Sequence, residues 1–110
     1  MSASIEDLQE QVVAFRDARD WRQFHDPKNL ALALSIEAAE LNELFLWKNP
    51  DEADPAGVRE ELADVFIYGL LLAHHYGLSL DSIVLGKLAV NEERYPVEKA
   101  RGSARKYTDL

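Results

Sequence analysis

The chain has no cysteine among its 110 residues. This absence excludes a disulfide framework, a thiolate zinc site and a cysteine nucleophile. Long hydrophobic runs are also missing, since the longest nearly apolar stretch, residues 65–73, is too short to cross a bilayer. Residues 1–4 lack the basic and apolar regions of a signal peptide. We therefore expect a cytoplasmic protein that makes no membrane contact.

Positive charge is in short supply, with 12 Lys and Arg against 20 Asp and Glu and a net charge of −8. Such a balance argues against a broad electrostatic grip on nucleic acid. An anionic small substrate would need a metal bridge or a local cluster of basic residues. The length suits one domain, and we expect a single helical domain over residues 1–110, with a basic C-terminal tail over about 97–110.

Helix signals cover most of the chain, because only five glycines and four prolines interrupt it. Ser4 and Asp7 resemble a capping box at the start of a helix over residues 4–19. This segment carries an apolar stripe at spacings of three and four, formed by Ile5, Leu8, Val12 and Phe15. The dipeptides at 26–27 and 54–55 are Asp-Pro, which place an acid at the N-cap and proline at the first helical position.

These starts predict a second helix that runs to about Trp47 and a third that runs to about Tyr76, with Gly77 as its cap. A fourth begins at Ser79 or Asp81 and ends before Pro96. No stretch alternates with period two for long enough to predict a strand. The sequence therefore predicts an all-α four-helix bundle.

The third predicted helix is apolar on nearly every face between residues 62 and 73. A helix of this kind is normally buried all round. A bundle of this size can hardly bury one helix on all sides by itself, so we expect a second subunit to cover its outer face. The prediction is a homo-oligomer, either a dimer or a tetramer built from two dimers.

Two pairs of acids carry the chemistry that the sequence predicts. Glu37 and Glu40 lie three residues apart on the second helix, and Glu61 and Asp64 lie three apart on the third. Each pair therefore leaves one face of its helix, among apolar neighbours. Buried carboxylates without nearby cations repel one another, and a divalent cation would relieve the repulsion. An all-oxygen ligand set favours Mg²⁺ or Mn²⁺ over zinc.

Two other interpretations of the acids stay open on spacing alone. A Glu-x-x-Glu pair is most often a solvated helix face. A di-iron carboxylate bundle would need Glu-x-x-His at two positions, and none of the histidines, His25, His74 and His75, follows a glutamate by three residues.

The acidic pattern resembles the signature of the MazG-like nucleoside triphosphate pyrophosphohydrolases, and most closely their dCTP pyrophosphatase branch. Five blocks carry the resemblance in order, at residues 20–25, 44–48, 60–68, 91–96 and 101–108. It implies a Mg²⁺-dependent enzyme that cleaves dCTP or a modified dCTP between the α and β phosphates, in nucleotide-pool cleansing. It assigns metal binding and catalysis to Glu37, Glu40, Glu61 and Asp64. The general base stays open among these acids and Glu60.

The resemblance also implies which residues contact the substrate. Trp21 and Trp47 match aromatic positions that would stack on the base. The other candidates are polar, aromatic or basic: His25, Lys28, Tyr68, Lys87, Asn91, Arg94 and Tyr95. The chain departs from the branch at Val12, where relatives carry histidine, and at Glu92 and Glu93, where they carry basic residues. Two alternatives therefore stand: the same chemistry on other triphosphates, and a non-catalytic helical interaction module.

Overall fold

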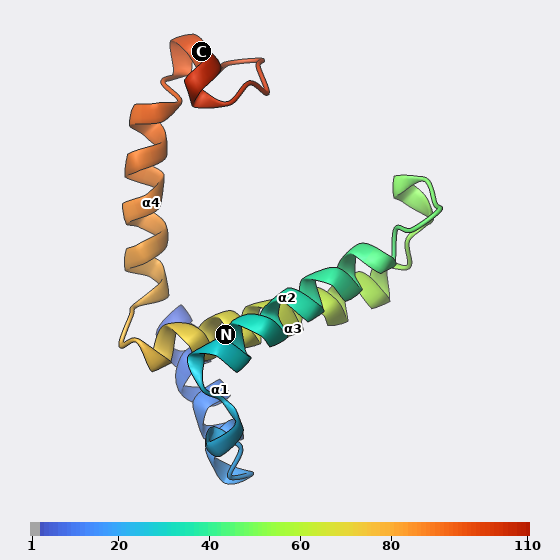
Figure 1. The fold of residues 1–110 in the computed structure, drawn as a ribbon, viewed down its shortest axis with the longest axis vertical. Coiled ribbons are helices and arrows are strands. Elements are labelled where there is room, and N and C mark those ends of the chain that lie inside the picture. Colours follow the sequence, from blue (N-terminus) through green and yellow to red (C-terminus); the bar gives the residue numbers. More distant parts are fainter. Residues whose placement is uncertain (1–2) are drawn as a thin grey trace. The chain divides into compact units, whose positions relative to one another are not determined.

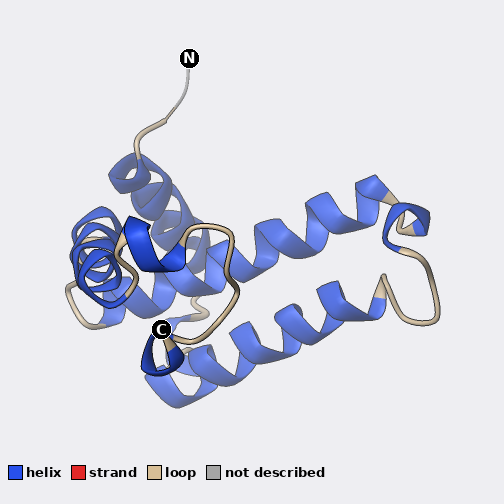
Figure 2. Cartoon of the chain, turned by 90° about the horizontal axis from the view of Figure 1, so that it is seen from above, coloured by secondary structure: helices blue, strands red, loops and turns tan. Residues whose placement is uncertain are grey.

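The computed structural model describes residues 3–110, which form helices and turns and no strand. This confirms the all-α class (Figure 2). The main helices are α1 (Ile5–Ala18), α2 (Pro27–Glu43), α3 (Pro55–His75) and α4 (Leu80–Arg94). Shorter turns are η1 (Arg22–Phe24), η2 (Pro50–Glu52), α5 (Val97–Ala100) and η3 (Tyr107–Asp109). None of the described helices is both long enough and apolar enough to span a membrane.

The helix starts follow the capping signals in the sequence. The Ser4 side chain accepts a hydrogen bond from the Asp7 backbone N–H at 3.1 Å, and the Asp7 side chain accepts one from the Ser4 N–H at 3.2 Å. Asp26 caps α2 by accepting from the Asn29 N–H at 2.8 Å, and Asp54 caps α3. Each bond satisfies a backbone donor that the first helical turn leaves free.

The end of α3 confirms Gly77 as a cap. Gly77 has φ 65°, in the left-handed region that glycine adopts at little cost. The Leu78 N–H then donates to the carbonyl oxygen of Ala73 at 2.9 Å, which closes the helix with a Schellman-type bond.

The predicted end of the second helix at Trp47 is wrong, because α2 stops at Glu43. From there Leu44, Phe45 and Leu46 donate to carbonyls only three residues back, and Trp47 takes a left-handed φ of 63°. The apolar spacing continues through this turn, so periodicity alone did not reveal it. The turn exposes 93% of Trp47.

The chain divides into two compact units, residues 1–78 and 79–110. In the first, α2 and α3 run side by side as a hairpin and α1 packs against α3 (Figures 1 and 2). The Gln9 side-chain amide ties α1 to α3 by donating to the Leu70 carbonyl at 3.1 Å. In the second unit, the Tyr107 ring of the tail meets the Tyr95 ring at 5.9 Å and the Arg94 guanidinium at 4.7 Å. A single domain and a four-helix bundle over the whole chain stay predictions.

A single chain leaves much of the apolar surface of α1 and α3 exposed. In α1, the stripe residues Ile5, Leu8 and Phe15 are 42–51% exposed, whereas Arg16 is buried. In α3, Leu70, Leu71 and Ala73 are buried, but Leu62 and Phe66 are 43% and 57% exposed. The hairpin thus covers only part of its apolar surface.

Candidate active site

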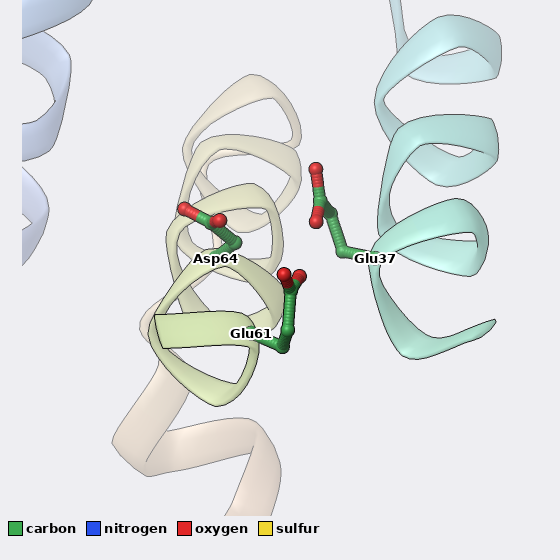
Figure 3. Close-up of side chains that lie close together, drawn as sticks. All are labelled: Glu37, Glu61 and Asp64. Atoms are coloured by element: carbon green, nitrogen blue, oxygen red, sulfur yellow. The ribbon is translucent and has the colours of Figure 1, made fainter. Parts of the chain in front are cut away.

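Acidic side chains from α2 and α3 meet at the interface between these helices. Glu37 reaches from α2 toward Glu61 and Asp64 on α3 (Figure 3). These residues, named here the carboxylate cluster, each offer an oxygen within 4.8 Å of the other two. Their side chains are half-buried. Glu40, one turn after Glu37, lies close enough to influence the pKa of both glutamates.

The cluster is short of positive charge and of hydrogen-bond donors. One carboxylate oxygen of Glu37 and one of Glu61, Oε2 in each, are buried with no hydrogen-bond partner. Among residues 3–110 the ion pair formed is between Arg16 and Asp17, which are not in the cluster. Buried acceptors without donors are costly. A divalent cation would supply the missing charge, and the all-oxygen donor set suits one.

Burial and mutual repulsion change the acidity of the cluster. Burial, together with the nearby carboxyls of Glu40 and Glu61, raises the pKa of Glu37 to about 7. Burial also raises the pKa of Glu61, and the closeness of Glu40 adds to it. Carboxyl pKa values raised in this way are common in catalytic and cation-binding sites.

An aromatic cavity of about 200 Å³ adjoins the cluster and shares Asp64 with it. Its aromatic walls are Phe15, Trp21, His25 and Tyr68. These rings pack edge to face in a chain, with centroids 5.8 Å apart for Phe15 and Trp21, 6.5 Å for Trp21 and His25, and 6.3 Å for His25 and Tyr68. Such packing fixes ring orientation. We name this hollow the aromatic cavity.

The rest of the aromatic cavity is aliphatic and charged. Val12, Ile67 and Leu71 supply apolar surface, and Arg16 supplies a guanidinium. Burial and the carboxylates of Glu37 and Asp64 raise the pKa of Tyr68, so its hydroxyl keeps its proton as a donor. Burial and the charge of Arg16 lower the pKa of His25, which favours the neutral imidazole.

The structure brings together part of the predicted site. The carboxylate cluster, Trp21, His25 and Tyr68 surround one region of the first unit. Trp47 lies in the turn after α2, and this turn is at the end of the hairpin away from α1 (Figure 1). Lys28 is exposed in the first turn of α2. The remaining candidates belong to the second unit: Lys87, Asn91, Arg94 and Tyr95. Their contact with a substrate stays a prediction.

Sequence reasoning missed Arg16, which lines the aromatic cavity and is only 5% exposed. Its Nε and Nη2 both approach Oδ1 of Asp17, at 3.0 and 2.8 Å. The available signal was its spacing, because Arg16 follows Val12 by four residues and so shares its helix face.

The fold and the site define a class, namely an all-helical protein with a carboxylate cluster beside an aromatic cavity. The model of the MazG-like family matches residues 32–110, and the chain belongs to the MazG-like family. It is 45% identical to dCTP pyrophosphatase 1 of Mus musculus, over 97% of this chain and 68% of that protein. The human protein of the same name is 44% identical over the same shares.

A solved structure agrees with these relatives. The crystal structure of a pyrophosphatase from Archaeoglobus fulgidus is 39% identical and superimposes with a TM-score of 0.79, covering 87% of this chain and 95% of that one. These matches confirm the predicted resemblance and the expectation that the chain is an enzyme of a pyrophosphatase family.

The raised pKa values of the carboxylate cluster predict how the metal-free protein responds to pH. A carboxyl whose pKa is higher folded than unfolded holds its proton longer in the folded state. The unfolded state therefore binds fewer protons than the folded state at pH values between the two pKa values. As a result, the contribution of Glu37 to the free energy of unfolding falls as the pH rises from about 4.5 to about 7. We expect the melting temperature of the wild type, measured with chelator present, to fall relative to that of Glu37→Gln over this window.

The comparison between the two proteins reports on Glu37 and on the carboxyls coupled to it, because the remaining titrating groups are shared. A constant difference in melting temperature from pH 4.5 to pH 7.5 would contradict the assignment. Excess Mg²⁺ should remove the fall in the wild type by binding the ionised cluster.

Proposed function

We propose that the chain is a Mg²⁺-dependent nucleoside triphosphate pyrophosphohydrolase that cleaves dCTP or a modified dCTP to the monophosphate and pyrophosphate. The observation that carries the proposal is the junction of two sites at Asp64. This residue belongs to the carboxylate cluster and also lines the aromatic cavity. A ligand with a flat base and a phosphate chain fits such a junction, with the base in the cavity and the phosphates toward the acids. A cytoplasmic location stays a prediction.

The residues present would hold the metal through Glu37, Glu61 and Asp64, with Glu40 as the fourth acid. Bound there, Mg²⁺ would neutralise phosphate charge and lower the pKa of an attacking water. The acids themselves would position the phosphate chain, because they determine where the cation that binds the phosphates is held. A carboxylate that stays unprotonated at neutral pH is the group that can accept a proton from water.

The base would lie against the aromatic rings of the cavity. Trp21 offers a flat surface, and the Phe15 and His25 rings hold it at fixed distances. The phenol of Tyr68 and the imidazole of His25 offer polar atoms at the cavity wall. The dCTP preference is supported by the similarity to the mouse and human dCTP pyrophosphatase 1. Val12 lines the cavity, so the departure at this position lies where a base would bind.

We also propose that the active protein is a homo-oligomer, a dimer or a tetramer. Leu32 and Ile36 share a face of α2 and are 55% and 51% exposed, and Leu62 and Phe66 share a face of α3. Apolar residues at this spacing and exposure favour a partner helix surface. Trp47 lies outside the aromatic cavity of its own protomer, and a second copy would give its exposed ring a surface to contact.

The metal assignment predicts that Glu61→Gln loses activity. The amide cannot supply a negative oxygen, so we expect Mg²⁺-dependent pyrophosphate release from dCTP to fall by roughly a hundredfold or more, the scale of losing one electrostatic contact at a reacting group. Glu6→Gln is the matched control, since Glu6 is exposed on α1 and belongs neither to the carboxylate cluster nor to the aromatic cavity.

The same assay should cover a panel of triphosphates, with Mg²⁺ and with chelator. Highest release from another triphosphate would keep the chemistry and overturn the dCTP preference. No release from any triphosphate by the wild type would favour the non-catalytic helical module. Undiminished release by Glu61→Gln would remove Glu61 from the metal ligands.

The cavity assignment predicts a binding defect for Trp21→Ala. Stacking of a base on an aromatic ring contributes roughly 1–3 kcal/mol, so KM for dCTP should rise about 5- to 150-fold. Trp21→Phe should recover part of the loss because it keeps an aromatic face. Phe24→Ala is the control, since Phe24 is exposed and lines no part of the cavity. An unchanged KM in Trp21→Ala would place the base elsewhere.

The oligomer is tested by multi-angle light scattering of the wild type and Phe66→Glu. We expect a mass of at least two chains for the wild type and a smaller species for the variant, because a charge on an apolar contact costs free energy on burial. Lys99→Glu, on the exposed α5 turn, controls for the added charge. A monomeric wild type at micromolar concentration would contradict the proposal.

A further inference from the structure

A second cavity in the first unit is lined mainly by basic side chains, although the chain as a whole is acidic. Its volume is about 290 Å³, and its walls contain two arginines and all of the chain's histidines: Arg16, Arg22, His25, His74 and His75. Gln23 and Asp26 complete the lining. We name it the basic cavity. A concentration of cationic and N–H groups is unexpected in a chain with net charge −8, and it is the arrangement that an anion needs.

The polar groups that could satisfy one another across the basic cavity are engaged elsewhere. The Asp26 carboxylate accepts from the backbone N–H and the side-chain amide of Asn29, both at 2.8 Å. The Gln23 amide donates to the Asp20 carbonyl and carboxylate, at 3.0 and 3.1 Å. These bonds hold the two side chains to their own helix ends.

Apart from Arg16, which pairs with Asp17, the basic donors that line the basic cavity are free. Within residues 3–110 the side chains of Arg22, His74 and His75 form no hydrogen bond or ion pair. Nδ1 of His25 is buried and has no hydrogen-bond partner. Arginine carries its charge throughout the physiological range, and each imidazole has at least one N–H in either protonation state.

The basic cavity is separate from the carboxylate cluster. Neither Glu37, Glu61 nor Asp64 lines it, whereas Asp64 lines the aromatic cavity. Arg16 and His25 border both cavities. A triphosphate with its base in the aromatic cavity and its phosphates at the cluster would therefore leave the basic cavity vacant.

We propose that the basic cavity binds an oxyanion of the phosphate class, held by Arg22, His74, His75 and the shared residues Arg16 and His25. Free phosphate and pyrophosphate share this chemistry, and pyrophosphate is a product of the proposed reaction. The anion site itself does not depend on that reaction. Because Arg16 and His25 line both cavities, an anion bound here touches the wall against which the base would lie.

The test is calorimetric titration of the full chain with inorganic phosphate, in chelator, so that no metal can bridge phosphate to the acids. We expect measurable binding by the wild type. Arg22→Gln and His74→Gln should each weaken it by roughly tenfold, the effect of losing one charge-assisted hydrogen bond. Arg59→Gln, an exposed arginine on the first turns of α3 that lines neither cavity, should leave it unchanged.

Two further titrations distinguish the basic cavity from the carboxylate cluster and phosphate from pyrophosphate. Glu61→Gln should bind phosphate like the wild type even when it releases no pyrophosphate, so loss of the enzymatic proposal and loss of the anion site are distinguishable. Tighter binding of pyrophosphate than of phosphate would identify the product as the source. The proposal is overturned if the wild type does not bind phosphate, or if Arg22→Gln and His74→Gln both bind it as tightly as the wild type. It is also overturned if Glu61→Gln loses as much phosphate affinity as those two variants.

Discussion

Repulsion among the acids of α2 and α3 is the constraint on which the site depends. These helices pack side by side and bring carboxylate oxygens of Glu37, Glu61 and Asp64 within 4.8 Å of one another. Packing alone would not select this arrangement, because apolar residues at the same positions would stabilise the hairpin more cheaply. The fold holds the acids through the caps at Asp26 and Asp54 and the Schellman-type end at Gly77. Because the packed helices hold these like charges close together, a divalent cation bound there would relieve their repulsion.

The acidic and basic side chains of the first unit are gathered in separate places, the carboxylate cluster and the basic cavity. The carboxylate cluster lies on one side of the aromatic cavity, and the basic cavity shares its Arg16 and His25 walls. The His25 ring stands at this boundary, in edge-to-face contact with both Trp21 and Tyr68. The lowered pKa of His25 follows from burial and from Arg16. A neutral imidazole there can donate on one side and accept on the other, according to its tautomer.

Local signals in the sequence were enough to predict the helix starts and the acidic pairs. A cap needs only residues within one turn, so Ser4, Asp26 and Asp54 could be read directly. The i, i+3 acids share a face by helix geometry alone. The end of α2 was not predictable in this way, because Trp47 continues the apolar spacing although its backbone is left-handed. The burial of Arg16 and the basic cavity depend on packing that brings together residues far apart in sequence, such as Arg16 and His74, which no local pattern encodes.

The exposed apolar surface and the carboxylate cluster lie on the same segment of α3. Phe66 follows Leu62 on α3 by one turn, and Leu62 lies between Glu61 and Asp64 in sequence, so the α3 segment that exposes apolar surface also carries two of the acids. Covering this surface with a second copy would exclude water from around the helix that bears them. Lower local polarity strengthens both the repulsion among the acids and their attraction for a cation. Association of subunits and metal binding would then stabilise one another, because each is favoured by the state that the other produces.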